Sequence, residues 1–281
     1  VLHDGLATIH CGTNLTLTLF GDPSSETMGL HVRDARTDPE HTILDVAIWQ
    51  PERWRNEGWN RHDLVHREDR IVGIRRAQTD DERFGYTLAA SVSGAPFSTE
   101  AIDDLTMRLL IAPSSNYTVW IANPSRMHSP DGDTDRQAVR LIEEASARGA
   151  ESVLAASKQW WHAFWSRSFV QYASDGMGDY VENLYYLNTY QIAAGSRGSY
   201  PFHFINGVYS CDGDETRWNG GYWHFNTRGV YNSFLASNHI DLMDPYFRLY
   251  LRNIETLRRN TRADYGIDGI KIPETVAYDG R

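Results

Sequence analysis

A segment rich in carboxylates, indoles and hydrogen-bonding side chains lies between residues 195 and 228 of this 281-residue chain. Its candidate substrate-binding residues are Asp212, Asp214, Glu215, Trp218, Trp223 and Arg228, joined by His224 and Asn226 as candidate catalytic residues. Indole rings can stack on the C–H faces of a pyranose, while carboxylate, imidazole, amide and guanidinium groups can bind its hydroxyls. The set therefore indicates a saccharide-binding cleft.

Other interpretations of the same residues stay open. Three nearby acids could hold calcium, but Asp212-Gly213-Asp214-Glu215 lacks the full EF-hand spacing, and an acidic turn in solvent explains it better. His224, Asn226 and Arg228 occupy alternate positions, which at the entrance to a helix could aim them into one pocket. Alternatively, Asn226 is an ordinary N-cap and His224 a packing residue. Because no Gly-rich phosphate loop and no metal-spaced His/Cys set occurs, we expect neither an organic cofactor nor a metal.

Glu274 is the second place where acid–base chemistry could occur. It follows Ile270-Lys271-Ile272-Pro273, in a glycine- and proline-containing stretch that we expect to be a loop. A carboxyl in an apolar setting has a raised pKa and can act as a general acid. The alternative is a Glu at a helix N-terminus, where the helix dipole favours negative charge.

Helices are expected to position these residues. Apolar spacing predicts a helix that starts at Asp133 or Thr134 and ends at Gly149, followed by helices over about 150–168, 179–194, 226–238 and 244–262. The stretch 195–222 has no helical period, and its six aromatic residues disfavour disorder. A long ordered loop is usually functional, so we expect it to form the rim of the site. Alternatively, its aromatic residues complete a helical core.

The first 125 residues alternate in hydrophobicity with a period of two. The clearest run places Leu105, Met107, Leu109 and Ile111 on one face, and further strands are predicted over 14–20, 42–49, 70–77, 85–93 and 117–122. The pattern predicts an antiparallel β-sandwich over residues 1–125, with two unrelated small sheets as the alternative. A linker with two helices is expected over 126–170 and a helical domain over 171–281.

Composition excludes several classes of protein. No run approaches ~18 apolar residues, so we expect no membrane-spanning helix. A net charge of −10, from 27 basic and 37 acidic residues, disfavours a broad nucleic-acid-binding surface. Cys11 and Cys211 cannot form a disulfide framework and are expected to be free thiols. The chain carries the sequons Asn14-Leu15-Thr16 and Asn116-Tyr117-Thr118, and a secreted or periplasmic location is the expectation.

Four strings resemble family 95 glycoside hydrolases and their bacterial and fungal relatives, which are six-hairpin glycosidases. They are Trp161-His162-Ala163-Phe164-Trp165-Ser166-Arg167-Ser168, Leu184-Tyr185-Tyr186-Leu187-Asn188-Thr189-Tyr190, Pro201 to Tyr209, and Tyr222-Trp223-His224-Phe225-Asn226. The resemblance covers about residues 133–281. It implies an N-terminal β-sandwich, a helical linker and an (α/α)6 barrel, of which residues 171–281 would form the N-terminal part. Because twelve helices need on the order of 200 residues or more, the chain is expected to be part of a longer protein.

The family's motif carries over only in part. A His-x-Asn-x-Asn segment lies at the family's catalytic centre, where its asparagines help to orient and activate water. His224 and Asn226 match this segment, but Arg228 replaces the second Asn, which puts α-L-fucoside specificity and the family's scheme of water activation in doubt. The family's general acid lies beyond the matched region, so Glu274 is an independent assignment.

The resemblance implies an inverting glycoside hydrolase acting on a plant- or host-type oligosaccharide or glycoside. In such an enzyme, one carboxylic acid protonates the glycosidic oxygen while a second activates water, with the carboxyls ~6.5–9.5 Å apart. Glu274 is the candidate acid, and Asp212, Asp214 or Glu215 or a further segment would supply the base. The alternatives are a non-catalytic or truncated carbohydrate-binding protein, or a phosphorylase or lyase on the same scaffold. The oligomeric state is open.

Overall fold

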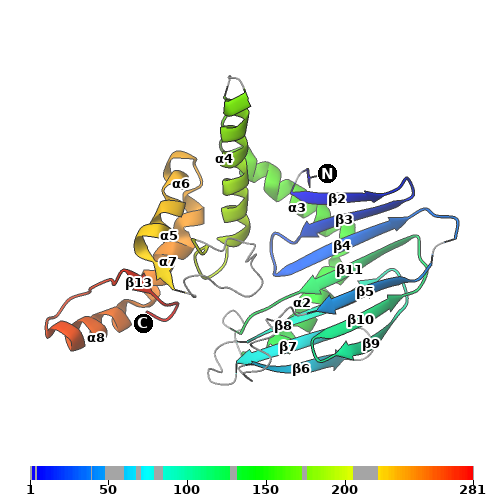
Figure 1. The fold of residues 1–281 in the computed structure, drawn as a ribbon, viewed down its shortest axis with the longest axis horizontal. Helices are drawn as coiled ribbons and strands as arrows, with labels where there is room; N and C mark the ends of the chain where they lie inside the picture. Colours follow the sequence, from blue (N-terminus) through cyan, green and yellow to red (C-terminus); the bar gives the residue numbers. More distant parts are fainter. Residues whose placement is uncertain are drawn as a thin grey trace. The chain divides into compact units, whose positions relative to one another are not determined.

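The computed structural model describes residues 2–3, 5–38, 40–47, 60–67, 71–78, 85–126, 132–172, 176–204 and 221–280. The chain divides into two units, Val1–Phe164 and Trp165–Arg281. Antiparallel sheets and two helices make up the first unit, and the second is mainly helical (Figure 1). Within the described ranges, no helix combines the length and apolar character that crossing a membrane requires.

Two antiparallel sheets form most of the first unit. In the described part of the chain, the larger sheet has eight strands in the order β1-β2-β3-β4-β11-β8-β7-β6, and the smaller has three in the order β5-β10-β9. The larger sheet contains β1 (Leu2–His3), β2 (Leu6–Cys11), β3 (Leu15–Gly21), β4 (Thr27–Asp34), β6 (Asn60–Arg67), β7 (Ile71–Gln78), β8 (Gly85–Ser93) and β11 (Asn116–Ala122). The smaller contains β5 (Thr42–Ala47), β9 (Phe97–Asp103) and β10 (Thr106–Ile111). The expected antiparallel sheets at the N-terminus are therefore confirmed.

The central strands of the larger sheet are buried on both faces. Successive side chains of a strand point to opposite sides, so Val119 and Trp120 of β11 enter different cores. Val119 packs in the core that includes Met107 and Leu109 of the smaller sheet. Trp120 packs in the core that includes Ile142 of helix α2 (Thr134–Arg148). The first unit therefore has three layers: the smaller sheet, the larger sheet and the helices α2 and α3 (Ala150–Trp165).

Both ends of α2 are fixed by local signals that the sequence predicts. Asp133 is the N-cap and accepts a hydrogen bond from the backbone N–H of Arg136, and Gly149 ends the helix with a φ of 79°. Arg148, in the last turn, donates to the carboxylate of Asp22, at 2.5 Å. The Asp22 side chain is only 1% exposed, so this ion pair ties the helix to the turn after β3.

The second unit consists of short helices joined by loops. Its helical elements are α4 (Gly176–Gly195), α5 (His224–Tyr231), α6 (Ser233–Ala236), the 3₁₀ helix η1 (Ile240–Met243), α7 (Asp244–Arg252) and α8 (Ile254–Tyr265). Two segments that periodicity predicts to be single helices are each divided: 226–238 at Asn232 and 244–262 at Asn253. The order of antiparallel sheets followed by helices agrees with the expected architecture.

The side chain of Asn253 explains the break between α7 and α8. Its amide nitrogen donates to the backbone oxygen of Leu249, at 2.9 Å, and to that of Tyr278, at 3.0 Å. Asn side chains that bond to nearby backbone groups compete with helix continuation. Gly280 also lies close, because a Cβ added there would be 2.8 Å from the Cβ of Asn253. At this break, Tyr278 and Gly280 therefore pack against Asn253, between α7 and α8.

Candidate active site

A sheet of two short strands brings together the two segments that carry His224 and Glu274. Strand β12 (Tyr222–Trp223) pairs antiparallel with β13 (Thr275–Val276), with Tyr222 opposite Val276 and Trp223 opposite Thr275. Beyond this pairing, the backbone N–H of His224 donates to the backbone oxygen of Glu274, at 2.6 Å. Two of the three residues that the sequence suggests for catalysis are thus backbone neighbours.

A glycine permits the close approach of these segments. Gly221 precedes β12, and a Cβ added to it would lie 2.7 Å from Cγ2 of Thr275. Real Cβ atoms essentially never make so short a contact, so any larger residue would force the Thr275 side chain or the strand that carries it to shift. The missing side chain of Gly221 therefore leaves room for Thr275 at this point of the pairing.

The imidazole of His224 lies among tyrosines of α7. Its Nδ1 is 3.5 Å from the hydroxyl of Tyr246, and its ring centroid is 6.5 Å from that of Tyr250 at an interplanar angle of 75°. Tyr246 in turn stacks on Tyr231 of α5, with ring centroids 5.4 Å apart. Burial raises the pKa of Tyr250, and the neighbouring phenol of Tyr246 adds to this effect. The hydroxyl of Tyr246 and the ring of Tyr250 therefore lie beside a half-buried imidazole.

Tyr231 is the centre of a buried hydrogen-bond chain that fixes this cluster. The backbone N–H of Phe202 donates to its hydroxyl oxygen at 2.6 Å, and the hydroxyl of Ser196 lies 2.6 Å away. The Ser196 hydroxyl donates to the backbone oxygen of Leu242, at 3.0 Å, so Tyr231 must donate to Ser196. One chain of hydrogen bonds thus joins the residue after α4, the aromatic loop, α5 and η1.

Tyr222 and Tyr200 extend the aromatic surface toward α7. The guanidinium of Arg252 lies over the ring of Tyr200, 4.6 Å from its centroid, and donates to the backbone oxygen of Ser199, at 2.9 Å. Burial raises the pKa of Tyr222, and the phenols of Tyr231 and Tyr200 add to this rise while Arg252 opposes it. A cation, planar rings and hydroxyls thus lie along the start of the loop that the sequence identifies as the site rim.

The structure does not bring His224, Asn226 and Arg228 into one pocket. All three lie in α5, where each residue turns the helix by about 100°, so Asn226 points away from His224 and Arg228, which are four residues apart and lie on the same side. Asn226 and Arg228 are exposed, and the guanidinium of Arg228 lies 5.7 Å from the centroid of Phe225. Alternate positions converge in a strand but not in a helix, so Asn226 does not point the same way as the other two, and a shared pocket for His224 and Arg228 stays a prediction.

Glu274 has a different environment from the one expected. Its side chain is exposed, and Ile270 and Ile272 before it are 42% and 46% exposed. The described surroundings therefore supply no apolar setting around the carboxyl. Its position beside His224 is a backbone relationship, and its role as general acid stays a prediction.

The remaining candidates are only partly described. Trp223 is half-buried and precedes α5 as its N-cap residue. Asp212, Asp214, Glu215, Trp218 and Cys211 lie outside the described residues. Cys11 is an exposed free cysteine, as expected.

Sequence reasoning missed the hydroxyls of Tyr231 and Tyr246 as parts of the site. Tyr246 and Tyr250 are four residues apart, so the sequence predicts that they lie on one face of a helix. This spacing indicates core residues, but it does not indicate that they are neighbours of His224. Tyr231 carries no local signal, because its hydrogen bonds reach residues far away in the sequence. Only the tertiary fold shows that Tyr246 lies beside the imidazole and that Tyr231 stacks on Tyr246.

Comparison with known proteins shows similarity at the level of fold. No family model matches the sequence, and neither does any curated protein. Among solved structures, the fold is similar to that of a protein described as "Putative kojibiose phosphorylase from human microbiome", with a TM-score of 0.61 and 13% sequence identity. The match covers 95% of this chain and 35% of that one, so this chain spans about a third of the neighbour's length. The likeness is one of fold alone, and family 95 itself finds no support.

Proposed function

We propose that this chain forms part of a carbohydrate-active enzyme that cleaves a glycosidic bond in an oligosaccharide. The observation that carries the proposal is the hydrogen bond from His224 to Glu274, because it holds a carboxyl-bearing residue next to an imidazole and a cluster of tyrosines. The likeness in fold to a protein named as a phosphorylase of a disaccharide supports the same class of reaction. In this proposal residues 1–125 form a β-sandwich domain, residues 126–170 a linker, and residues 171–281 the first part of an (α/α)6 barrel.

The proposed reaction is hydrolysis with inversion. Glu274 protonates the glycosidic oxygen, and a second carboxyl activates water on the opposite face of the sugar. Asp212, Asp214 and Glu215 are the candidates in this chain for the second carboxyl. His224 binds the substrate through its imidazole, and Trp218 and Trp223 stack on sugar rings. Asn226 and Arg228 lie on an exposed part of α5 and would act at the rim of the site.

Phosphorolysis is the second candidate, and the name of the fold neighbour favours it. Inorganic phosphate would then take the place of water and leave with the sugar as a sugar 1-phosphate. Arg228 and Arg217 are the basic residues near His224 in the sequence that could bind this phosphate. A lyase has no such support.

The experiment is to incubate the full chain with kojibiose, other disaccharides and aryl glycosides, with and without inorganic phosphate. Free sugar formed without phosphate supports hydrolysis, whereas a sugar 1-phosphate formed only with phosphate supports phosphorolysis. Proton NMR of the first product gives its anomeric configuration, and retention would contradict inversion. Binding of oligosaccharides without cleavage under any condition would instead support a carbohydrate-binding protein.

A further inference from the structure

A groove along helix α8 combines guanidinium groups with a carboxylate. It has a volume of about 440 Å³ and is lined by Glu255, Arg258, Arg259, Arg262, Ala263 and Asp268. The four charged helix residues are spaced i, i+3, i+4 and i+7, so they share one face of α8. Asp268 comes from the loop that follows the helix. A groove of this volume falls within the range of small-molecule sites, ~300–1,000 Å³, and is large enough for a monosaccharide rather than only a bare ion.

The charges of the groove are only partly neutralised. Arg258 donates to the carboxylate of Glu255, at 2.6 Å, which leaves its other N–H groups available. The guanidinium of Arg262 makes no hydrogen bond or ion pair with any residue that the structure describes. Three arginines and two carboxylates line the groove, in a chain whose net charge is −10. The groove is therefore a local positive site on an acidic protein.

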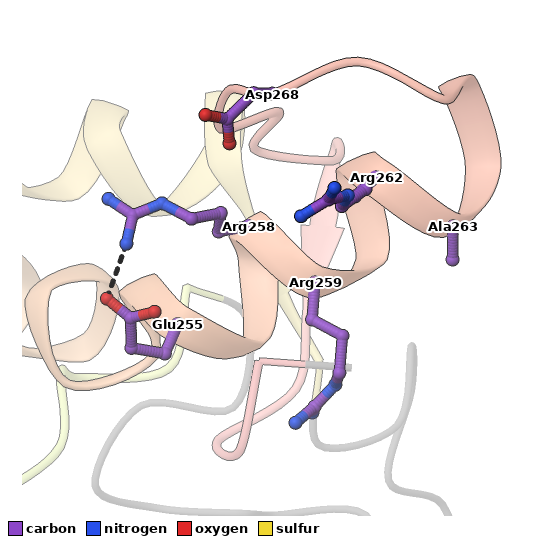
Figure 2. A pocket seen from close by; sticks show the side chains of 6 residues that line it. All are labelled: Glu255, Arg258, Arg259, Arg262, Ala263 and Asp268. Carbon is purple, nitrogen blue, oxygen red and sulfur yellow. Dashed lines mark hydrogen bonds and ion pairs between the residues drawn. The ribbon is translucent and has the colours of Figure 1, made fainter.

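The orientation of the side chains divides the groove into two parts. Figure 2 shows Arg258 and Arg262 on the side of α8 toward Asp268, while the guanidinium of Arg259 points away in this view. No ion pair joins Asp268 to either arginine among the described residues, so space remains between the carboxylate and the guanidiniums. A ligand in this space would meet donors on the helix side and an acceptor on the loop side.

We propose that this groove binds a monosaccharide-sized organic anion, with its oxyanion on Arg262 and Arg258 and its hydroxyls on Asp268. Guanidinium groups match carboxylate and phosphate oxygens with paired hydrogen bonds, and a carboxylate accepts only from hydroxyl or N–H donors. A bare anion would gain nothing from Asp268 and would be repelled by it. A neutral sugar would use Asp268 but leave Arg262 without its charged partner. An acidic sugar, such as a sugar phosphate or a uronic acid, satisfies both sides.

The test is calorimetric titration of the full chain with glucose 1-phosphate, glucuronate, glucose and inorganic phosphate. We expect at least one of the two acidic sugars to bind more tightly than glucose and than inorganic phosphate, and their ranking shows whether phosphate or carboxylate is preferred. Arg262→Gln should weaken that binding about tenfold, and Asp268→Asn about fivefold. The matched control is Arg248→Gln, which removes an exposed, paired arginine of α7 and should leave binding unchanged.

Three outcomes would overturn the proposal. The first is that neither acidic sugar binds. The second is that inorganic phosphate binds as tightly as both acidic sugars, which indicates a site for a simple ion. The third is that Arg262→Gln and Arg248→Gln weaken binding equally, which indicates a general effect of charge. Circular dichroism and thermal unfolding of each variant check that it is folded. Because the groove variants leave His224 and Glu274 in place, loss of binding here is distinguishable from failure of the proposed glycosidic activity.

Discussion

The backbone N–H of His224 donates to the backbone oxygen of Glu274, at 2.6 Å, immediately beyond the pairing of β12 with β13. This contact fixes the two residues as neighbours without using either side chain. The imidazole and the carboxyl are thus left available for a substrate.

Glu274→Gln should lower kcat/KM for glycosidic cleavage by about 100-fold or more, because a general acid contributes factors of 10²–10⁴. The melting temperature should not change, since the side chain is exposed and only its backbone oxygen supports the sheet. Steady-state kinetics and differential scanning fluorimetry measure the two effects. Asp264→Asn removes another exposed carboxylate of the same unit and serves as the control. Full activity of Glu274→Gln would remove this residue from the mechanism.

Gly221→Ala should destabilise the second unit by about 1–3 kcal/mol, because the new methyl group would overlap Cγ2 of Thr275. The double variant with Thr275→Ser removes that Cγ2 and should recover most of the loss. Urea unfolding measures each change. Gly229→Ala is the matched control, since a Cβ there would meet nothing within 4 Å and alanine favours a helix. Equal effects of both alanine variants would contradict the steric explanation.

Tyr231→Phe should lower the free energy of unfolding by about 1–3 kcal/mol, because it leaves the N–H of Phe202 and the hydroxyl of Ser196 without their buried partner. Tyr246→Phe keeps the same ring stacking and should cost less, since its hydrogen bond to His224 is long, at 3.5 Å. Urea unfolding of the two variants compares these costs directly. A larger loss for Tyr246→Phe would show that Tyr231 is not the centre of the chain of hydrogen bonds.

The stability of the second unit should fall as the pH is lowered through about 6.5. His239 is fully buried, and burial together with the positive charge of Arg167 lowers its pKa, against the opposing effect of Asp241. The unfolded chain takes up a proton near the ordinary histidine pKa of about 6.5, whereas the folded chain does so only at lower pH. The unfolded state therefore binds more protons in this range and is favoured by acid.

The variant His239→Gln should weaken this dependence on pH, as measured by urea unfolding between pH 7.5 and about pH 5. Burial and the charge of Arg33 also lower the pKa of His31, but His31 lies in the first unit, so the difference between wild type and variant in the unfolding of the second unit isolates His239. An unchanged slope in His239→Gln would show that this residue does not titrate differently on folding.

Features with local causes could be predicted from the sequence. The ends of α2 follow from Asp133 and Gly149, whose capping roles depend only on adjacent residues. The alternation of Leu105, Met107, Leu109 and Ile111 likewise follows from strand geometry, and all four are at most 4% exposed.

Features with distant causes could not be predicted. Helical periodicity continues through Asn253, and the break depends on the backbone oxygen of Tyr278, far along the chain. Strands β12 and β13 have two residues each, too short for any pattern to show. The neighbourhood of His224 and Glu274 was therefore beyond sequence reasoning, although both residues could be singled out by their chemistry.

The use of main-chain groups to join β12 to β13 has a consequence for how this site can change. A substitution at position 224 or 274 leaves in place the backbone amide and carbonyl that hold the two segments together. The distance between the two positions therefore stays the same whichever side chains they carry. Selection or laboratory evolution can therefore try new chemistry at both positions while the frame beneath them is preserved, provided that residue 221 stays a glycine.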